Sequence, residues 1–115
     1  MADLTRTVTA DDTARAVGSG DLDVLGTPVV IAWCEAATMA ALELEPQLTS
    51  VGTHVDVRHL APSPVGAMIE VHAEVTERTE RSATFAVEAR DGGTVVASGT
   101  VVRAVVDRER FLARL

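Results

Sequence analysis

One stretch of the sequence limits the possible folds more than any other. Residues 24–42 hold a single charged side chain, Glu35, and are otherwise mostly apolar or small. The stretch approaches the length of a membrane span, but Pro28 and Glu35 interrupt it, and acidic rather than basic residues flank it. Because a helix that is apolar on all sides is usually an enclosed one, the stretch predicts a buried core helix.

The ends of this helix carry recognisable signals. Thr27 precedes Pro28, and a Thr hydroxyl can cap a free backbone N–H while proline needs no donor at the first helical position. Pro46 disfavours helical geometry in the residue before it. We therefore predict a helix from Pro28 to about Glu43 with Thr27 as its N-cap.

From Ser50 the apolar residues recur with a period of two, which is typical of strands. Val51, Thr53, Val55, Val57 and His59 share one parity and are predicted to face inward. Further strands are predicted at 69–76, 83–89 and 94–106, with a short strand at 4–8, a brief helical turn ending at Val17 and another after Arg108. This order is typical of the α+β hotdog fold, in which a five-stranded antiparallel sheet wraps one long central helix.

The length and the charge restrict the domain count and the partners. At 115 residues the chain predicts one domain, 1–115, and a second copy is expected to cover the far side of the helix in a homodimer. The net charge is −7 and lysine is absent, so nucleic acid is not an expected partner. Cys34 is the only cysteine, which excludes an internal disulfide, and residues 1–10 lack a signal-peptide pattern. We expect a cytoplasmic protein without a membrane partner.

Glu35 is the first candidate for chemistry. A carboxylate within an uncharged stretch costs several kcal/mol to bury unless it is paired, hydrogen-bonded or protonated. It either pairs with an Arg for structural reasons or orients a histidine or a water molecule. Buried ionisable groups concentrate at functional sites, so we favour the second interpretation.

His59 and Thr27 complete the candidate set. His59 is the one histidine on an inward parity, where it can meet the helix. The Thr27 hydroxyl lies at the positive end of the helix dipole, where a base could activate it. Thr27 and Glu35 are about 12 Å apart at 1.5 Å per residue. His59 must therefore bridge them, or they meet across two protomers.

Four segments, in this order, resemble the fluoroacetyl-CoA thioesterase branch of the hotdog superfamily. They are Thr27–Glu35, Gly52–His59, Pro62–Gly66 and Ser98–Ala104. The resemblance implies a catalytic Thr, Glu and His triad at Thr27, Glu35 and His59. It also implies a glycine N–H beside the thioester at Gly52 and an Arg near the ligand at Arg103. The branch closes its site with an aromatic lid, and residues 17–26 contain no aromatic side chain, so fluorine selectivity is not implied.

These observations predict hydrolysis of a small acyl-CoA, or of a related acyl thioester, to the free acid and thiol without a cofactor or metal. His59, oriented by Glu35, would take a proton from Thr27 or from a water molecule beside it. Two alternatives stay open: a hotdog enoyl-CoA hydratase, and a noncatalytic acyl- or metabolite-binding module in which Glu35 and His59 only satisfy the core. Arg103 could contact the ligand or form a surface ion pair. Cys34 and Trp33 are predicted to be packing residues.

Overall fold

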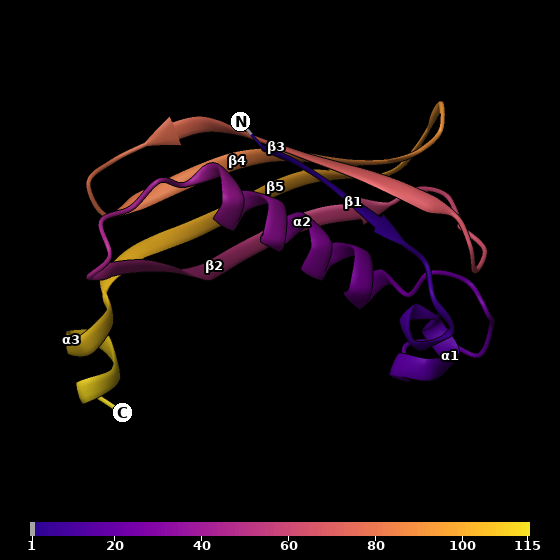
Figure 1. The fold of residues 1–115 in the computed structure, drawn as a ribbon, viewed down its shortest axis with the longest axis horizontal. Coiled ribbons are helices and arrows are strands. Elements are labelled where there is room, and N and C mark those ends of the chain that lie inside the picture. Colours follow the sequence, from indigo (N-terminus) through magenta and orange to yellow (C-terminus); the bar gives the residue numbers. More distant parts are fainter. Residues whose placement is uncertain (1) are drawn as a thin grey trace.

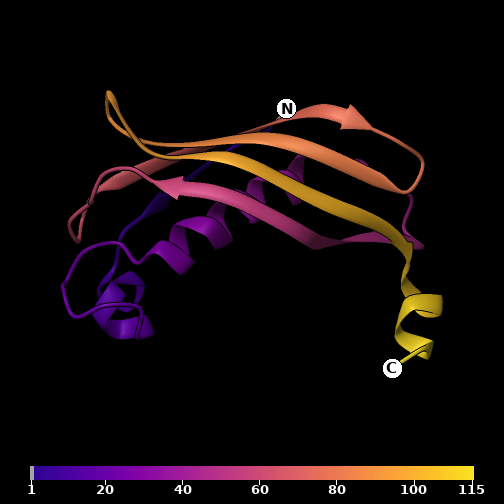
Figure 2. The same ribbon diagram turned by 180° about the vertical axis from the view of Figure 1, so that it is seen from behind.

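The computed structural model describes residues 2–115, which form one antiparallel sheet that curves over a single long helix (Figure 1 and Figure 2). The elements in chain order are β1 (Ala2–Thr7), η1 (Ala10–Asp12), α1 (Ala14–Val17), α2 (Thr27–Ala41), β2 (Leu48–His59), β3 (Met68–Arg78), β4 (Ser82–Asp91), β5 (Thr94–Asp107) and α3 (Arg108–Ala113). The strands lie in the order β1-β3-β4-β5-β2. The predicted arrangement of one long helix and five antiparallel strands is confirmed.

The two central strands follow the predicted alternation. Ile69, Val71 and Ala73 of β3 are buried, and so are the four inward residues of β4, namely Ala83, Phe85, Val87 and Ala89. Phe85 is the largest of the fully buried side chains. Both strands lie between two other strands of the sheet. Residues that alternate along β3 and β4 therefore point alternately to the inner and the outer face of the sheet.

Within this chain the helix α2 is covered on one side only, and the cover of its other side by a second copy remains a prediction. Val30, Cys34 and Ala37 are fully buried against the sheet, whereas Met39 on the opposite side is 54% exposed. A single sheet can shield only the side of a helix that faces it, and Figure 1 shows nothing on the other side of α2. No helix among residues 2–115 is long and apolar enough to cross a membrane.

The start of α2 differs from the prediction by one position. Gly26 is the N-cap, because its carbonyl accepts hydrogen bonds from the N–H groups of Val29 and Val30 at 3.0 and 3.2 Å. Thr27 is therefore the first helical residue, and the prediction that its hydroxyl caps the helix is wrong. The helix also ends at Ala41 rather than Glu43. The hydroxyl of Thr27 is left free for a partner outside the helix.

A β-bulge in β2 corrects the predicted inner face of that strand. Gly52 lies opposite Arg103, but His54 lies opposite Val102, so the register shifts around Thr53. Directly opposed residues share a face, and Arg103 faces inward because it is only 4% exposed. Before the bulge, Gly52 therefore lies on the inner face in place of the predicted Val51 and Thr53.

After the bulge, the residues of β2 that were predicted to face inward do so. His59 pairs with the buried Ala97 and keeps its inward position, whereas Val55 is 38% exposed because β2 lies at the edge of the sheet.

The segment before α2 folds back onto the first turn of that helix. The Thr13 hydroxyl caps α1 by accepting from the N–H of Ala16 at 3.1 Å, and the N–H of Gly26 donates to the carbonyl of Asp12 at 2.9 Å. A further backbone hydrogen bond, 2.8 Å long, runs from Leu25 to the Ser63 carbonyl. These bonds hold the segment beside the end of β2, where Thr27 and His59 lie.

Candidate active site

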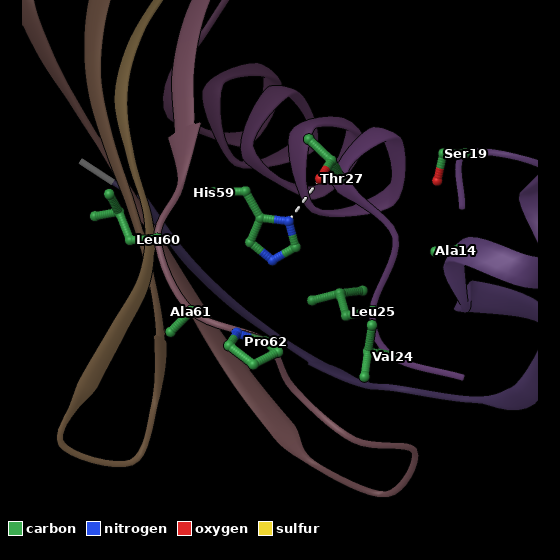
Figure 3. Close-up of a pocket in the computed structure, with 9 residues that line it drawn as sticks. All are labelled: Ala14, Ser19, Val24, Leu25, Thr27, His59, Leu60, Ala61 and Pro62. Carbon is green, nitrogen blue, oxygen red and sulfur yellow. Dashed lines mark hydrogen bonds between the residues drawn. The ribbon is translucent and has the colours of Figure 1, made fainter. Parts of the chain in front are cut away.

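Thr27 and His59 form the central contact of the site. Thr27 comes from the first turn of α2 and His59 from the last position of β2, and the Thr27 Oγ1 lies 2.7 Å from the His59 Nδ1 (Figure 3). This distance is normal for a hydrogen bond that involves a hydroxyl group. A nucleophile candidate and a base candidate, 32 positions apart in the sequence, are thus brought together by the packing of α2 against the sheet.

A pocket of about 250 Å³ opens beside this hydrogen bond (Figure 3). Its walls come from α1 and the following segment, from the start of α2 and from the end of β2. The lining residues are Ala14, Ser19, Val24, Leu25, Thr27, His59, Leu60, Ala61 and Pro62. Complete small-molecule sites usually occupy about 300–1,000 Å³, so this pocket suits one end of a ligand rather than a whole cofactor-sized molecule.

The electrostatics of His59 favour the neutral imidazole. Burial lowers the pKa of His59 from its ordinary 6.5, and the backbone carbonyl of Ala61 opposes this to a smaller extent. At neutral pH one ring nitrogen is therefore free of a proton. With Nδ1 as that nitrogen, the Thr27 hydroxyl donates to it, which is the arrangement that general-base activation requires.

Glu35 and Arg103 form a second polar pair on the inner face. The Glu35 Oε2 lies 3.5 Å from the Arg103 Nη1, and the two side chains are 34% and 5% exposed. Arg103 also donates from Nε to the Ser50 hydroxyl at 2.8 Å and from Nη2 to the Ser50 carbonyl at 3.0 Å. Burial lowers the pKa of Arg103 and the Glu35 charge raises it. Arg103 thus forms an ion pair on the inner face rather than at the surface, and this pair explains how the helix tolerates the carboxylate of Glu35.

Gly52 lies directly against this pair. A Cβ atom at Gly52 would lie 2.6 Å from the Glu35 Oε2, which is closer than side chains normally approach. The missing side chain therefore makes room for the carboxylate of Glu35. The sequence prediction that the Gly52 N–H contacts a thioester remains a prediction.

The structure separates the predicted triad into two groups within one chain. Thr27 contacts His59, whereas Glu35 contacts Arg103 and lies against Gly52. Among residues 2–115 the His59 Nε2 has no hydrogen-bond partner, so His59 does not bridge Thr27 and Glu35. That alternative is wrong for the single chain, and the alternative in which they meet across two protomers remains a prediction.

Ser50 is the polar neighbour of Arg103 that the sequence did not predict. It binds Arg103 through both its hydroxyl and its carbonyl. Strict alternation with the predicted inner residues Val51 and Thr53 would place Ser50 on the outer face, and the bulge near Thr53 turns it inward. Ser50 and Gly52 are two positions apart, so in a strand they share a face. The prediction that Gly52 faces the ligand could therefore have placed Ser50 on the same face.

Cys34 does not belong to the reactive groups. It is fully buried, and burial together with the Glu35 charge raises the pKa of its thiol to about 11. The thiol therefore stays protonated at neutral pH, and the prediction that Cys34 packs in the core is confirmed. Within residues 2–115 no group of three His, Cys, Asp or Glu side chains is placed to hold a metal ion.

Known proteins resemble this chain over nearly its whole length. The sequence profile of the family described as fluoroacetyl-CoA-specific thioesterase matches residues 8–109. The fluoroacetyl-CoA thioesterase of Streptantibioticus cattleyicolor is 35% identical over 95 residues, which are 81% of this chain and 68% of that protein. The sequence-based resemblance to this family is confirmed, and so is the prediction of a thioesterase.

Solved structures support the same assignment. A mutant of the fluoroacetyl-CoA-specific thioesterase FlK, in complex with fluoroacetate and CoA, is 30% identical with a TM-score of 0.91, covering 97% of this chain and 94% of that chain. A hot-dog-like protein from Thermanaerovibrio acidaminovorans is 21% identical with a TM-score of 0.87, covering 97% of this chain and 84% of that chain. The second similarity concerns the fold alone, and together they confirm the predicted hotdog fold.

Proposed function

Because the chain belongs to the fluoroacetyl-CoA-specific thioesterase family, we propose that it hydrolyses a small acyl-CoA, or a related acyl thioester, to the free acid and thiol. The observation that carries this proposal is the hydrogen bond of 2.7 Å between Thr27 and His59 at a small pocket. Nucleophilic and general-base catalysis both need such a contact beside the space that the reacting carbonyl occupies.

The proposed chemistry begins with His59. Its Nδ1 accepts a proton from the Thr27 hydroxyl, or from a water molecule bound there, as the oxygen attacks the thioester carbonyl. The oxyanion forms near the positive end of α2, and backbone N–H groups, including that of Gly52 from a second copy of the chain, stabilise it. The C–S bond then breaks and the thiolate takes the proton from His59. Attack by Thr27 adds a second step, in which water hydrolyses the acyl ester in the same way.

Glu35 and Arg103 enter this proposal through a second copy of the chain. Glu35 lies against Gly52, and seven positions of β2 separate Gly52 from His59, roughly 20 Å along a strand. The β2 strand is an edge strand with its central residues exposed. Two such edges paired antiparallel would bring the Gly52 end of one copy beside the His59 end of the other.

In that homodimer, Glu35 of one copy orients His59 of the other. Gly52 and Arg103 then contact the substrate from the side opposite Thr27. This arrangement gives each carboxylate two roles, because it balances the buried Arg103 of its own chain and completes the site of its partner.

The wall of the pocket favours a small acyl group without a special substituent. Val24 and Leu25 supply the apolar part of the wall before Thr27, and residues 17–26 include no aromatic ring. A pocket of about 250 Å³ without an aromatic lid suits a short aliphatic acyl chain. We therefore propose acyl-CoA esters of a few carbons, without selectivity for fluorine.

A panel of acyl-CoA esters, monitored by release of free thiol, tests the function. We expect turnover that is highest for short acyl chains and that is lost in both Thr27→Val and His59→Ala, with the thermal unfolding of both variants close to that of the original protein. Crotonyl-CoA, monitored for loss of its double bond, is the control for a hydratase. Hydration without thiol release, or binding of the esters without any turnover, would overturn the proposal.

A further inference from the structure

A second pocket lies at the opposite end of the molecule from Thr27 and His59. It has a volume of about 270 Å³ and lies between the end of β5 and α3. Figure 1 and Figure 2 show α3 and α1 at the two ends of the molecule. Three arginines, Arg81, Arg110 and Arg114, line this pocket together with Phe111. None of the chemistry proposed above uses these side chains.

The charge of the pocket is unusual for this chain. The protein carries a net charge of −7 and has ten basic residues, and three of them line this one cavity. Across residues 2–115 no salt bridge engages Arg81, Arg110 or Arg114, all of which are exposed. Asp107 is the only acidic residue in the lining, and its carboxylate caps α3 by accepting from the backbone N–H of Arg110 at 3.0 Å. Three unpaired guanidinium groups beside one carboxylate make a site for an anion with more than one negative charge.

Phe111 adds a second requirement for the ligand. Its ring is 36% exposed and lines the same pocket as the arginines. An exposed aromatic ring offers a stacking surface for a nucleic-acid base, and guanidinium groups bind phosphate oxygens in a bidentate manner. A phosphorylated nucleoside satisfies both features, whereas a free inorganic anion satisfies only one.

We propose that this pocket, formed by Arg81, Arg110, Phe111 and Arg114, binds the phosphorylated adenosine end of CoA. The proposal rests on the proposed function, which supplies a ligand with this chemistry. Arg110, Phe111 and Arg114 follow residue 109, where the match to the family profile ends. The assignment therefore comes from the pocket itself and not from that match.

The position of the pocket agrees with the proposed dimer. Hydrogen bonds from Arg108 to Gln47 at 2.9 Å and from Val105 to Arg81 at 2.8 Å fix the pocket near the Leu48 end of β2. The 12 residues of β2 span about 40 Å, so one CoA does not join this pocket to the pocket at His59 of the same chain. In an antiparallel β2 pair, the Leu48 end of one copy lies towards the His59 end of the other. The acyl group then reacts in one subunit while the nucleotide binds the other.

Titration calorimetry with adenosine 3′,5′-bisphosphate tests the site without any turnover. We expect the original protein to bind it, and the double variant Arg110→Ala/Arg114→Ala to bind it at least tenfold more weakly. Arg90→Ala is the matched control, because Arg90 is an exposed arginine that pairs with Glu88 outside the pocket. Equal affinity in the double variant, or an equal loss in the control, would overturn the proposal. Inorganic phosphate that binds as tightly as the nucleotide would overturn the adenosine assignment.

Steady-state kinetics separate this proposal from the proposed function. The double variant should raise KM for acyl-CoA about tenfold with little change in kcat, and should leave KM for the matching acyl-pantetheine, which lacks the nucleotide, unchanged. If the original protein hydrolyses neither substrate, the proposed function fails. The calorimetry still tests whether the pocket binds the nucleotide. If the original protein hydrolyses both and the variant changes neither KM, the pocket proposal fails. Thermal unfolding of each variant confirms that it is folded.

Discussion

Two polar pairs connect α2 to the sheet, one to β2 and one to β5, and they differ in kind. Thr27 and His59 make one hydrogen bond of 2.7 Å beside a pocket, and neither group needs a charge to form it. Glu35 and Arg103 make an ion pair at 3.5 Å, and Arg103 is almost completely buried. The first pair can pass a proton to and from a ligand, whereas the second holds its charges in place.

The difference follows from what surrounds each pair. The buried Arg103 stays charged and needs acceptors, which Ser50 and Glu35 provide. His59 has only Thr27 on Nδ1, and burial of its ring keeps it neutral rather than charged. The proposed general base therefore belongs to the first pair, whereas loss of a member of the second pair is expected to affect stability first.

Loss of His59, the proposed general base, should produce the largest loss of activity. Removal of the imidazole in His59→Ala should lower kcat about a hundred- to ten-thousand-fold, since this is the usual contribution of a general base. The change in unfolding temperature should be small, because His59 makes one hydrogen bond at the edge of the pocket. Thiol release and thermal unfolding, measured on the same preparation, distinguish a loss of catalysis from a loss of folded protein. A variant that keeps full activity would remove His59 from the mechanism.

Arg103→Ala should show the opposite pattern, with stability affected first. It removes two hydrogen bonds to Ser50 and leaves Glu35 without its cation, so we expect a loss of about 2–4 kcal/mol in the free energy of unfolding. Arg90→Ala is the control and should cost less than about 1 kcal/mol, because its pair with Glu88 is exposed. Urea unfolding measures both. Equal losses would show that the inner ion pair contributes no more than a surface one.

Gly52→Ala tests whether the Glu35 position matters for activity. The added Cβ would push the Glu35 carboxylate, which is the flexible end of a side chain, so the stability change should stay within about 1 kcal/mol. We expect activity to fall roughly tenfold if Glu35 acts across a dimer, an effect in the range of a misplaced supporting group. Gly99→Ala is the contrasting variant, because its Cβ would overlap the backbone carbonyl of Asp56 and should destabilise the sheet strongly. Unchanged turnover in Gly52→Ala would argue against a catalytic Glu35.

The effect of pH on activity and stability should be smaller than the effects of these substitutions. The native pKa of His59 lies below 6.5, so activity should persist as the pH falls to 6.5 and should decrease only when it passes through the lowered value. The unfolded chain takes up the proton at the ordinary pKa of 6.5, so the contribution of His59 to stability declines as the pH falls below that value. A profile of kcat/KM against pH tests this. An acidic limb centred above pH 6.5 would contradict it.

Much of the fold was predictable from local patterns. The alternation over β3 and β4 placed every inward residue correctly, because central strands convert a period of two directly into two faces. The same reasoning failed before the bulge in β2, where one extra residue moves Ser50 and Gly52 to the inner face. It also failed at the helix start, since Gly26 and Thr27 are both acceptable N-caps and the choice depends on the tertiary partner of the Thr27 hydroxyl.

The sequence by itself determined the kinds of groups and the order of the elements: one long apolar helix, five strands and a carboxylate, an imidazole and a hydroxyl among them. Only the tertiary structure decided which of these groups meet. Thr27 reaches His59 and Glu35 reaches Arg103, because the bulge and the register of β2 against β5 set which side chains face α2. Periodicity reports the face of each residue in its own element, whereas contacts between elements depend on register, which no local pattern encodes.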